Sequence, residues 1–438
     1  MRDVRSLLLL PLVIFSTAVN GRAPSAPAPA PALLVLKAGA LLDVRQGRLL
    51  PNHALLIEGD RIKAVGPTEV VLAHAPRGTP VLDLDRLTVL PGRIDMHVHL
   101  TANPEHAGYR ALSVSVPREA LHGAANAWRT LQAGFTTVRN LGASGYADVA
   151  LRDAIAEGDV PGPRMLVSGP ALGITGGHCD NNLLAPEFKH KAEAVADGPW
   201  AARAKVREVV KYGADLIKVC ATGGVLSKGD HPGTQQYTFE ELQAIVEEAH
   251  KLGRKVAAHA HGAEGIKAAI RAGVDSIEHA SLIDEEGLRL ARERGTYLVM
   301  DIYNDDFILQ HGERVGMLPE ALEKERQIGQ LQRENFARAV RAGVRIAFGT
   351  DAGVYPHGDN AKQFAYMVKY GMTPVDAIRS ATIWAAELLG WSDRVGALEP
   401  GKFADLVAVE GNPLEDITLL ERVTFVMRGS VVVKDNRR

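Results

Sequence analysis

The sequence predicts an α/β fold, in which a (β/α)₈ TIM barrel carries a small β-sandwich domain composed of both chain ends. Two observations lead to this prediction. In the middle of the chain, apolar runs of strand length alternate with stretches whose apolar residues recur at helical spacing. At both ends, short alternating apolar runs are broken by Gly, Asp or Pro, as in β-sheets.

The middle of the chain contains eight strand-length runs, and eight parallel strands close such a barrel. The runs are RIDMHVHL (93–100), FTTVRNLG (135–142), RMLVSGP (164–170), DLIKVCA (215–221), KVAAHAH (255–261), VDSIEHA (274–280), TYLVMD (296–301) and RIAFGTD (345–351). The alternative is a doubly wound open sheet, which would be expected to carry a glycine-rich loop after its first strand. That position holds HVHLTANP instead.

The domain boundaries follow from these patterns. Strand-like runs such as LLVLKAGALLDV fill residues 33–91, the first part of the β-sandwich. The barrel occupies 92–399. Residues 400–438, with ADLVAVEG and ERVTFVMRGSVVVKD, return to the same pattern and complete the β-sandwich.

The first residues read as a secretory signal peptide, which we place at 1–22. Two arginines precede an apolar run of nine residues, Leu7 to Phe15, which is too short to cross a bilayer. The alternatives are an uncleaved anchor or a misplaced start site. A Pro/Ala-rich linker follows at 23–32. We expect an exported protein, periplasmic or secreted, with no membrane contact after cleavage.

Composition excludes several classes of protein. A net charge of −2 gives no footprint for nucleic acid, and a hydrophobic fraction of 46% argues against disorder. The two cysteines, Cys179 and Cys220, cannot supply a cysteine-rich zinc site. They could pair in an oxidising compartment, but we expect two free thiols.

Polar residues stand near the ends of five predicted strands, where barrels place their active sites. They are His97, His99, Lys218, His259, His279 and Asp351. Each alone has a structural explanation, such as a hydrogen-bonded core histidine, a snorkelling lysine or a helix cap. Their gathering at one end of one barrel favours a metal site.

Neutral imidazoles and a carboxylate suit Zn²⁺ or a similar divalent ion. A lysine ammonium would repel such an ion, so Lys218 must be deprotonated or modified. Burial lowers the pKa of a lysine, and a neutral amine can capture CO₂ to form a carbamate. A carbamate is an anionic bridge for two metal ions, which can share a hydroxide made from water.

These motifs resemble the amidohydrolase superfamily. GRIDMHVHL, LIKVCATGG, VAAHAHG, SIEHAS and FGTDAG carry the resemblance in order, and LEPGKFADLVAVEGNP resembles the return into the family's β-sandwich. Within the superfamily, TGGVLS, HPGTQQYTFEEL and YPHGDNAKQF are similar to secreted Xaa-Pro dipeptidase-like and ochratoxin-hydrolysing amidohydrolases. The resemblance also suggests a homo-oligomer.

The resemblance implies a role for each strand-end residue. His97 and His99 with Asp351 would hold one metal ion. His259 and His279 would hold the second, and N-carboxylated Lys218 would bridge the two. Asp351 would also take the proton of the attacking hydroxide and deliver it to the leaving amine. His261 shares the face of His259, but the family's motif uses the first histidine of that pair.

Other residues have less specific patterns. Tyr237 could donate a hydrogen bond to the scissile carbonyl, or it could pack on the rim. His178 could bind a substrate carboxylate, or it could be a plain loop histidine. Arg139 is expected to lie behind the metal ligands. At Arg93 and Asn140 this sequence differs from the family's pattern. We expect these two differences to affect local packing or the charge near the site, and not the metal ligands.

The sequence therefore predicts a binuclear zinc-dependent amidohydrolase. It would hydrolyse the amide bond of dipeptides or N-acyl amino acids, including Xaa-Pro-like or ochratoxin-like amides, by metal-hydroxide attack. Mn²⁺ and Co²⁺ suit the same ligands. Lactonase, phosphotriesterase-like or cyclic-amidine hydrolase chemistry could use the same site. A metal-free structural homologue would require missing ligands, and none is missing.

Overall fold

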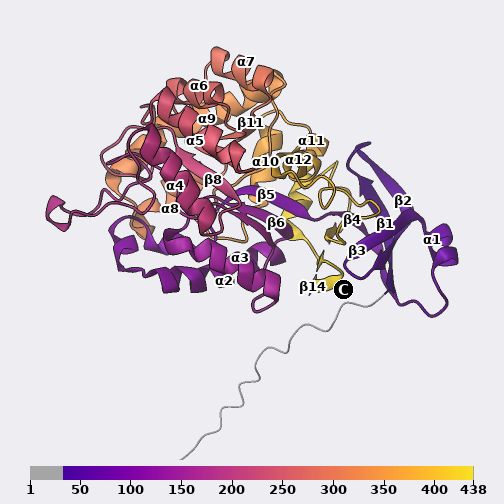
Figure 1. The fold of residues 1–438 in the computed structure, drawn as a ribbon. Coiled ribbons are helices and arrows are strands. Elements are labelled where there is room, and N and C mark those ends of the chain that lie inside the picture. Colours follow the sequence, from indigo (N-terminus) through magenta and orange to yellow (C-terminus); the bar gives the residue numbers. More distant parts are fainter. Residues whose placement is uncertain (1–32, 438) are drawn as a thin grey trace, which may run out of the picture.

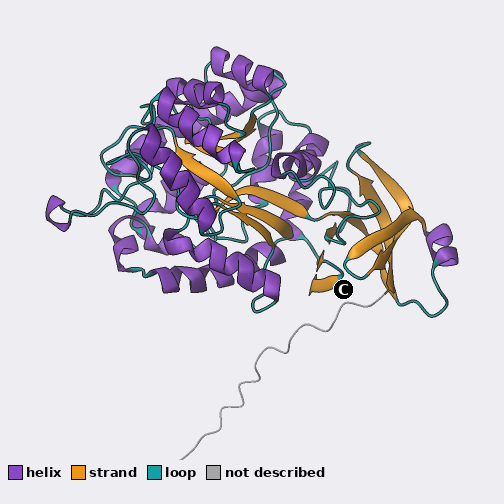
Figure 2. Ribbon diagram, viewed as in Figure 1, coloured by secondary structure: helices purple, strands orange, loops and turns teal. Residues whose placement is uncertain are grey.

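The structure is a computed structural model that describes residues 33–437 (Figure 1). The predicted signal peptide and linker lie outside the described residues. A large body of helices around a central set of strands makes up most of the molecule, and a smaller β-rich part lies beside it (Figure 2). No helix of the described chain combines the length and apolar character needed to cross a membrane.

The smaller part is the predicted β-domain assembled from both chain ends. Its seven strands are hydrogen-bonded in the order β14-β13-β12-β4-β1-β2-β3. Strand β12 pairs antiparallel with β4, with Leu406 opposite Pro91, and this pairing joins the two ends of the chain. The strands are β1 (Leu33–Asp43), β2 (Arg48–Glu58), β3 (Arg61–Pro67), β4 (Val81–Pro91), β12 (Leu406–Val409), β13 (Phe425–Arg428) and β14 (Val431–Asp435).

The central strands of the larger part are parallel, as a barrel requires. They are β5 (Arg93–Val98), β6 (Phe135–Asn140), β7 (Arg164–Val167), β8 (Leu216–Cys220), β9 (Lys255–Ala260), β10 (Ser276–His279) and β11 (Tyr297–Val299). A parallel bridge from Leu172 to Val219 connects the segment after β7 to β8.

The eighth predicted strand closes the barrel without forming a regular strand. Ile346 makes a parallel bridge to Leu298 in β11, and Ala352 makes one to Val98 in β5. The backbone cannot stay extended through this segment because Asp351 has a φ of 56°. The segment thus ends in a turn that places Asp351 inside the barrel mouth.

Helices surround the strands (Figure 2). Helix α5 shows why they begin where they do: the Thr238 side chain accepts a hydrogen bond from Glu241 N, and Glu241 Oε2 accepts one from Thr238 N at 2.8 Å. The α-helices are α1 (Thr68–His74), α2 (Val116–Gln132), α3 (Ala147–Glu157), α4 (Pro199–Lys211), α5 (Phe239–Lys251), α6 (Ala263–Ala272), α7 (Glu285–Arg294), α8 (Asn304–Val315), α9 (Pro319–Arg341), α10 (Lys362–Lys369), α11 (Pro374–Ser380) and α12 (Ile383–Leu389). Short 3₁₀ turns are η1 (Pro104–His106), η2 (Gly108–Ser113), η3 (Ser144–Tyr146), η4 (Pro186–Phe188) and η5 (Ile417–Arg422).

Arg93, the first departure from the family pattern, is a packing residue. It is buried at the start of β5 and donates a hydrogen bond to Leu420 O at 2.7 Å and another to Ala133 O. Its guanidinium carbon lies 4.5 Å from the centroid of the Phe135 ring. Burial lowers its pKa to about 9. Arg93 therefore fastens the barrel to the C-terminal segment, far from the strand ends that carry the site.

Candidate active site

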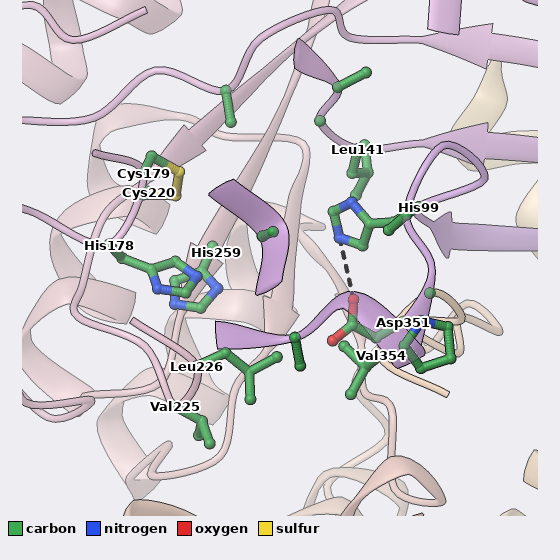
Figure 3. A pocket seen from close by; sticks show the side chains of 18 of the residues that line it. His99, Leu141, His178, Cys179, Cys220, Val225, Leu226, His259, Asp351 and Val354 are labelled. Carbon is green, nitrogen blue, oxygen red and sulfur yellow. Dashed lines mark ion pairs between the residues drawn. A yellow bond between two sulfur atoms is a disulfide. The ribbon is translucent and has the colours of Figure 1, made fainter. Parts of the chain in front are cut away.

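The predicted strand-end residues line one cavity of about 750 Å³ at the mouth of the barrel. Figure 3 shows His99 and Asp351 on one side of this cavity and His178 and His259 on the other. His97, Lys218, His261 and His279 line the same cavity. The parallel strands explain the gathering, because their carboxyl ends all open at the same end of the barrel.

The first group consists of His97, His99 and Asp351. Their potential ligand atoms all lie within 4.8 Å of one another. Asp351 Oδ1 is 3.1 Å from His99 Nε2, the pair joined by a dashed line in Figure 3, and 3.4 Å from His97 Nε2. His97 Nε2 is buried and has no hydrogen-bond partner among the described residues. A buried nitrogen of this kind fits a metal ligand better than a core histidine, which would be hydrogen-bonded.

The second group consists of His259, His261 and His279, whose potential ligand atoms also lie within 4.8 Å of one another. The ring centroids of His259 and His261 are 4.6 and 4.8 Å from that of His279. His261 Nδ1 is 2.7 Å from Ser281 Oγ, and His259 Nε2 is 3.1 Å from Gly223 O. The structure thus brings His261 into the site together with His259.

Lys218 lies in the middle of β8 and is only 4% exposed. Burial lowers its pKa to about 8, although the carboxylates of Glu278 and Asp351 oppose the shift. A larger fraction of Lys218 is therefore neutral near pH 8 than for a lysine in water. This is the state that the carbamate hypothesis requires.

Burial also sets the charge of the histidines. It lowers the pKa of His97 and His259 well below the usual range, and nearby Lys218 adds to the effect. Burial opposes protonation of His279 as well, but the carboxylates of Asp301 and Asp351 outweigh it and raise its pKa. Neutral imidazoles are the form that binds metal ions.

A layer of side chains behind the cavity orients the histidines. His97 Nδ1 is 3.1 Å from Glu278 Oε2, and Arg139 donates to Glu278 Oε1 at 2.7 Å. Arg139 therefore lies behind the histidines, as the sequence predicts. His279 Nδ1 is 2.8 Å from Asp301 Oδ1. The His279–Asp301 contact is of the kind that fixes the tautomer and the orientation of a ligand histidine, whereas His97 Nδ1 and Glu278 Oε2 lie close together without a hydrogen bond.

Sequence reasoning missed Glu278 and Asp301. Side chains alternate along a strand, so Glu278 should point away from the face of its neighbour His279. His279 and Ala280 have φ values of 71° and 53°, and this left-handed turn breaks the alternation. Asp301 ends the run TYLVMD, so its position at a strand end was the available signal.

Asn140, the second departure from the family pattern, orders the loop after β5. Its Oδ1 accepts a hydrogen bond from Leu100 N at 2.7 Å, and its Nδ2 donates to Asp148 Oδ2 at 3.2 Å. Asn140 is fully buried. It supports the segment that follows His99.

The prediction for Tyr237 is wrong. Its side chain is fully buried in the hydrophobic core, and its hydroxyl donates to Ala196 O at 3.0 Å. Burial raises the pKa of Tyr237. The residue after Tyr237 caps helix α5, so the chain turns inward here and carries the ring away from the cavity.

His178 does lie in the cavity. Its ring stacks on that of His259 with 4.0 Å between centroids, and its Nδ1 is 2.8 Å from Ser227 Oγ (Figure 3). Burial lowers the pKa of His178 to about 4. It is therefore a neutral hydrogen-bonding group beside the proposed metal ligands.

The expectation of two free thiols is also wrong. Cys179 and Cys220 form a disulfide beside the cavity (Figure 3). The bridge between Leu172 and Val219 holds the segment after β7 against β8 and brings the cysteines together. A sequence separation of 41 residues hides this proximity from sequence reasoning.

Comparison with known proteins decides the family. The model of the amidohydrolase family matches residues 88–433. The chain belongs to the amidohydrolase family. It is a metal-dependent enzyme that acts on C–N bonds, in keeping with the two histidine groups.

Ochratoxinase of Aspergillus niger is 34% identical over 424 residues, which cover 91% of this chain and 86% of that protein. A crystal structure of a Xaa-Pro dipeptidase with bound methionine in the active site is 39% identical, with a TM-score of 0.85, and the match covers 91% of this chain and 99% of that one. A prolidase complexed with N-methylphosphonate-L-proline is 34% identical, with a TM-score of 0.84, and the match covers 92% of this chain and 100% of that one.

Proposed function

We propose that this amidohydrolase hydrolyses the amide bond of dipeptides or N-acyl amino acids, and that it uses two divalent metal ions, with Zn²⁺ as the first choice. The carrying observation is that two groups of ligand atoms, each within 4.8 Å, open into one cavity. The similarity to a Xaa-Pro dipeptidase, a prolidase and ochratoxinase supports this substrate class.

In this proposal His97, His99 and Asp351 would hold one ion, and His259 and His279 would hold the other. Lys218, as a carbamate, would supply ligand oxygens to both. Its neutral Nζ attacks CO₂, so that a nitrogen–carbon bond forms as one C–O π bond opens to give the carboxylate, and one proton leaves the nitrogen to solvent. The lowered pKa of Lys218 supports this step. His261 is an alternative ligand to His259, because both belong to the same group.

Metal ions bound there would supply Lewis-acid activation of water and of the substrate carbonyl. The protein's own part is proton transfer and orientation. Asp351 takes the proton of the attacking water through its carboxylate and gives it to the amine that leaves. His99 Nε2, 3.1 Å away, and the charge of His279 keep the pKa of Asp351 low although burial opposes this.

The test is the release of amino acid or amine by the purified, zinc-loaded protein. The panel contains Xaa-Pro and other dipeptides, N-acyl amino acids, ochratoxin A, a lactone and a phosphotriester. We expect release from amide substrates, loss of activity after chelation, and recovery with added Zn²⁺. Cleavage of the lactone or phosphotriester alone would leave the metal site in place and overturn the proposed reaction.

A further inference from the structure

The side chains that line the cavity include more acidic than basic groups. Such a lining would repel a substrate carboxylate. Lys218 is the only lysine or arginine among the described residues that line it. The carboxyl groups that line it belong to Glu119, Glu193, Asp301, Asp305, Glu325 and Asp351. Two divalent metal ions would offset part of this negative charge, so the carboxyl groups that hold no ion are the ones that favour a positively charged group on the ligand.

Two of these carboxyl groups stand out because each has a buried oxygen that receives no hydrogen bond from any group except the other carboxyl. Asp305, in the first turn of α8, is 2% exposed, and Glu325, in α9, is 3% exposed. Asp305 Oδ2 and Glu325 Oε1 are buried and accept no hydrogen bond from any other group of the described residues. The hydrogen bond between the two carboxyl groups requires one shared proton. Leaving such atoms unpaired is costly. We refer to Asp305 and Glu325 as the acid pair.

The other lining carboxylates do have partners. Asp301 contacts the His279 ring nitrogen Nδ1, and Asp351 contacts the His99 ring nitrogen Nε2. Glu119 Oε1 accepts from Ser144, and Glu193 Oε2 accepts from Gly145 N. Glu119, Glu193 and Asp301 therefore have hydrogen-bond partners within the protein, and Asp351 is a proposed metal ligand.

Arg333 is the positively charged side chain that contacts the acid pair, but its hydrogen bonds go to other groups. Its Nε is 3.1 Å from Asp305 Oδ2 but donates to Ile302 O, and its NH2 donates to Asp306 Oδ1 at 2.8 Å. Arg333 therefore balances charge at Asp305 without satisfying the unpaired oxygen. No such cation contacts Glu325 Oε1 within the described part of the chain.

Apolar side chains flank the acid pair on the same helical faces. Ile308 lies one turn after Asp305 in α8, and Ala321 lies one turn before Glu325 in α9. Both line the cavity, as does Met317. An aliphatic stem could pack there with its charged end on the carboxylates.

We propose that the acid pair is a cation subsite that binds an ammonium or guanidinium group of the substrate. This inference deepens the proposed function and rests on it for the identity of the substrate. The cation has two possible sources. It could be the α-ammonium of a dipeptide or the basic side chain of one of its residues.

Paired substrates distinguish these sources. The pairs are Ala-Lys with Ala-norleucine, Lys-Ala with norleucine-Ala, and Ala-Ala with N-acetyl-Ala-Ala. We expect at least one cationic member to exceed its neutral partner tenfold or more in kcat/KM. Glu325→Gln should reduce that preference, the ratio of the two kcat/KM values, at least tenfold. The control is Glu323→Gln on the same helix, whose side chain is 61% exposed, and it should keep the preference.

A binding experiment separates failure of the subsite from failure of the proposed reaction. L-lysine, Nα-acetyl-lysine and L-norleucine are titrated calorimetrically into the metal-loaded protein. Tighter binding of lysine than of norleucine, weakened tenfold by Glu325→Gln, would support the subsite even if no dipeptide were cleaved. If the α-ammonium is the recognised group, Nα-acetyl-lysine should bind more weakly than lysine.

Two results would overturn the inference. One is the absence of any preference for a cation, in turnover and in binding by the wild-type protein. The other is a preference that Glu325→Gln leaves intact. Circular dichroism establishes that the variant is folded, and Asp305→Asn replaces it if it is not. The comparison of lysine with norleucine on the wild-type protein needs no variant at all.

Discussion

His279 Nδ1 lies 2.8 Å from Asp301 Oδ1, and this contact fixes which ring nitrogen of His279 faces the cavity. Gln332 donates to the same oxygen at 3.1 Å, and Asn304 donates to Asp301 Oδ2 at 2.6 Å. Asp301 is thus held from two sides and in turn holds His279. Contacts of this kind tune ligand histidines in metal sites.

Asp301→Asn should lower metal affinity about 10–100-fold, because it removes the charge that orients His279 and makes it basic. The measurement is metal retained per chain after dialysis against graded chelator. Asp393→Asn, at a side chain 77% exposed, is the matched control. Equal retention by Asp301→Asn and wild type would show that the contact does not support a ligand.

Arg139→Met should destabilise the barrel by about 3–5 kcal/mol, because it leaves the buried Glu278 charge without its partner. Arg139 is 3% exposed and also donates to Met96 O at 2.6 Å. Denaturant unfolding of the metal-free protein measures the change. Arg289→Met breaks an exposed pair with Glu293 and should cost about 0.5 kcal/mol or less. Similar losses for both variants would contradict the prediction.

The fold and the strand-end residues could be predicted because they follow from repeating patterns. Alternating runs and helices predict the barrel, and the barrel rule places His97, Lys218 and Asp351 at one end. Glu278 could not be predicted, because its inward position depends on the left-handed backbone at His279. No periodicity in the sequence encodes such a turn.

Loops account for the errors. Tyr237 lies between a loop and a helix, and only the packing of α5 shows that its ring enters the core. The pairing of Cys179 with Cys220 depends on how the segment after β7 lies against β8. The acid pair is formed by two helices that meet only in the folded chain. In each case the deciding contact is between segments whose relative position the sequence pattern does not specify.

Lys218→Ala should lose metal and activity together, because the proposed bridge between the two ions disappears. Elemental analysis gives the metal content. Carbon-13 NMR after exposure to labelled bicarbonate should show a carbamate signal in the wild type and none in the variant. Lys211→Ala, at an exposed lysine in α4, should keep the signal and both ions. Two ions and full turnover in Lys218→Ala would remove the carbamate from the proposed mechanism.

The disulfide predicts that no thiol is alkylated in the denatured protein without reductant, and that two are alkylated after reduction. Mass analysis of the two samples decides this. Replacing both Cys179 and Cys220 with alanine should cost about 4 kcal/mol, the chain-entropy value for a loop of 41 residues. Two alkylated cysteines without reductant would contradict the pairing.

The preference for a cationic substrate should rise with pH. Burial raises the pKa of Glu325 to about 7, and the charge of Asp301 adds to this, while a hydrogen bond from Asp305 and the charges of Arg333 and His279 oppose it. Burial, followed by the charge of Glu325, also raises the pKa of Asp305. Well below pH 7 Glu325 is neutral and attracts a cation weakly, and above pH 7 it is charged and attracts a cation strongly. For the pairs that differ at the side chain, Ala-Lys with Ala-norleucine and Lys-Ala with norleucine-Ala, the ratio of kcat/KM should therefore be larger at pH 8 than at pH 5.5, because the lysine side chain stays charged over this range. Because the ratio compares two substrates on one enzyme, titration of the shared metal site cancels from it.

Glu325→Gln should make the ratio nearly independent of pH. A ratio that does not change with pH in the wild type would contradict the assignment of the acid pair as the cation subsite.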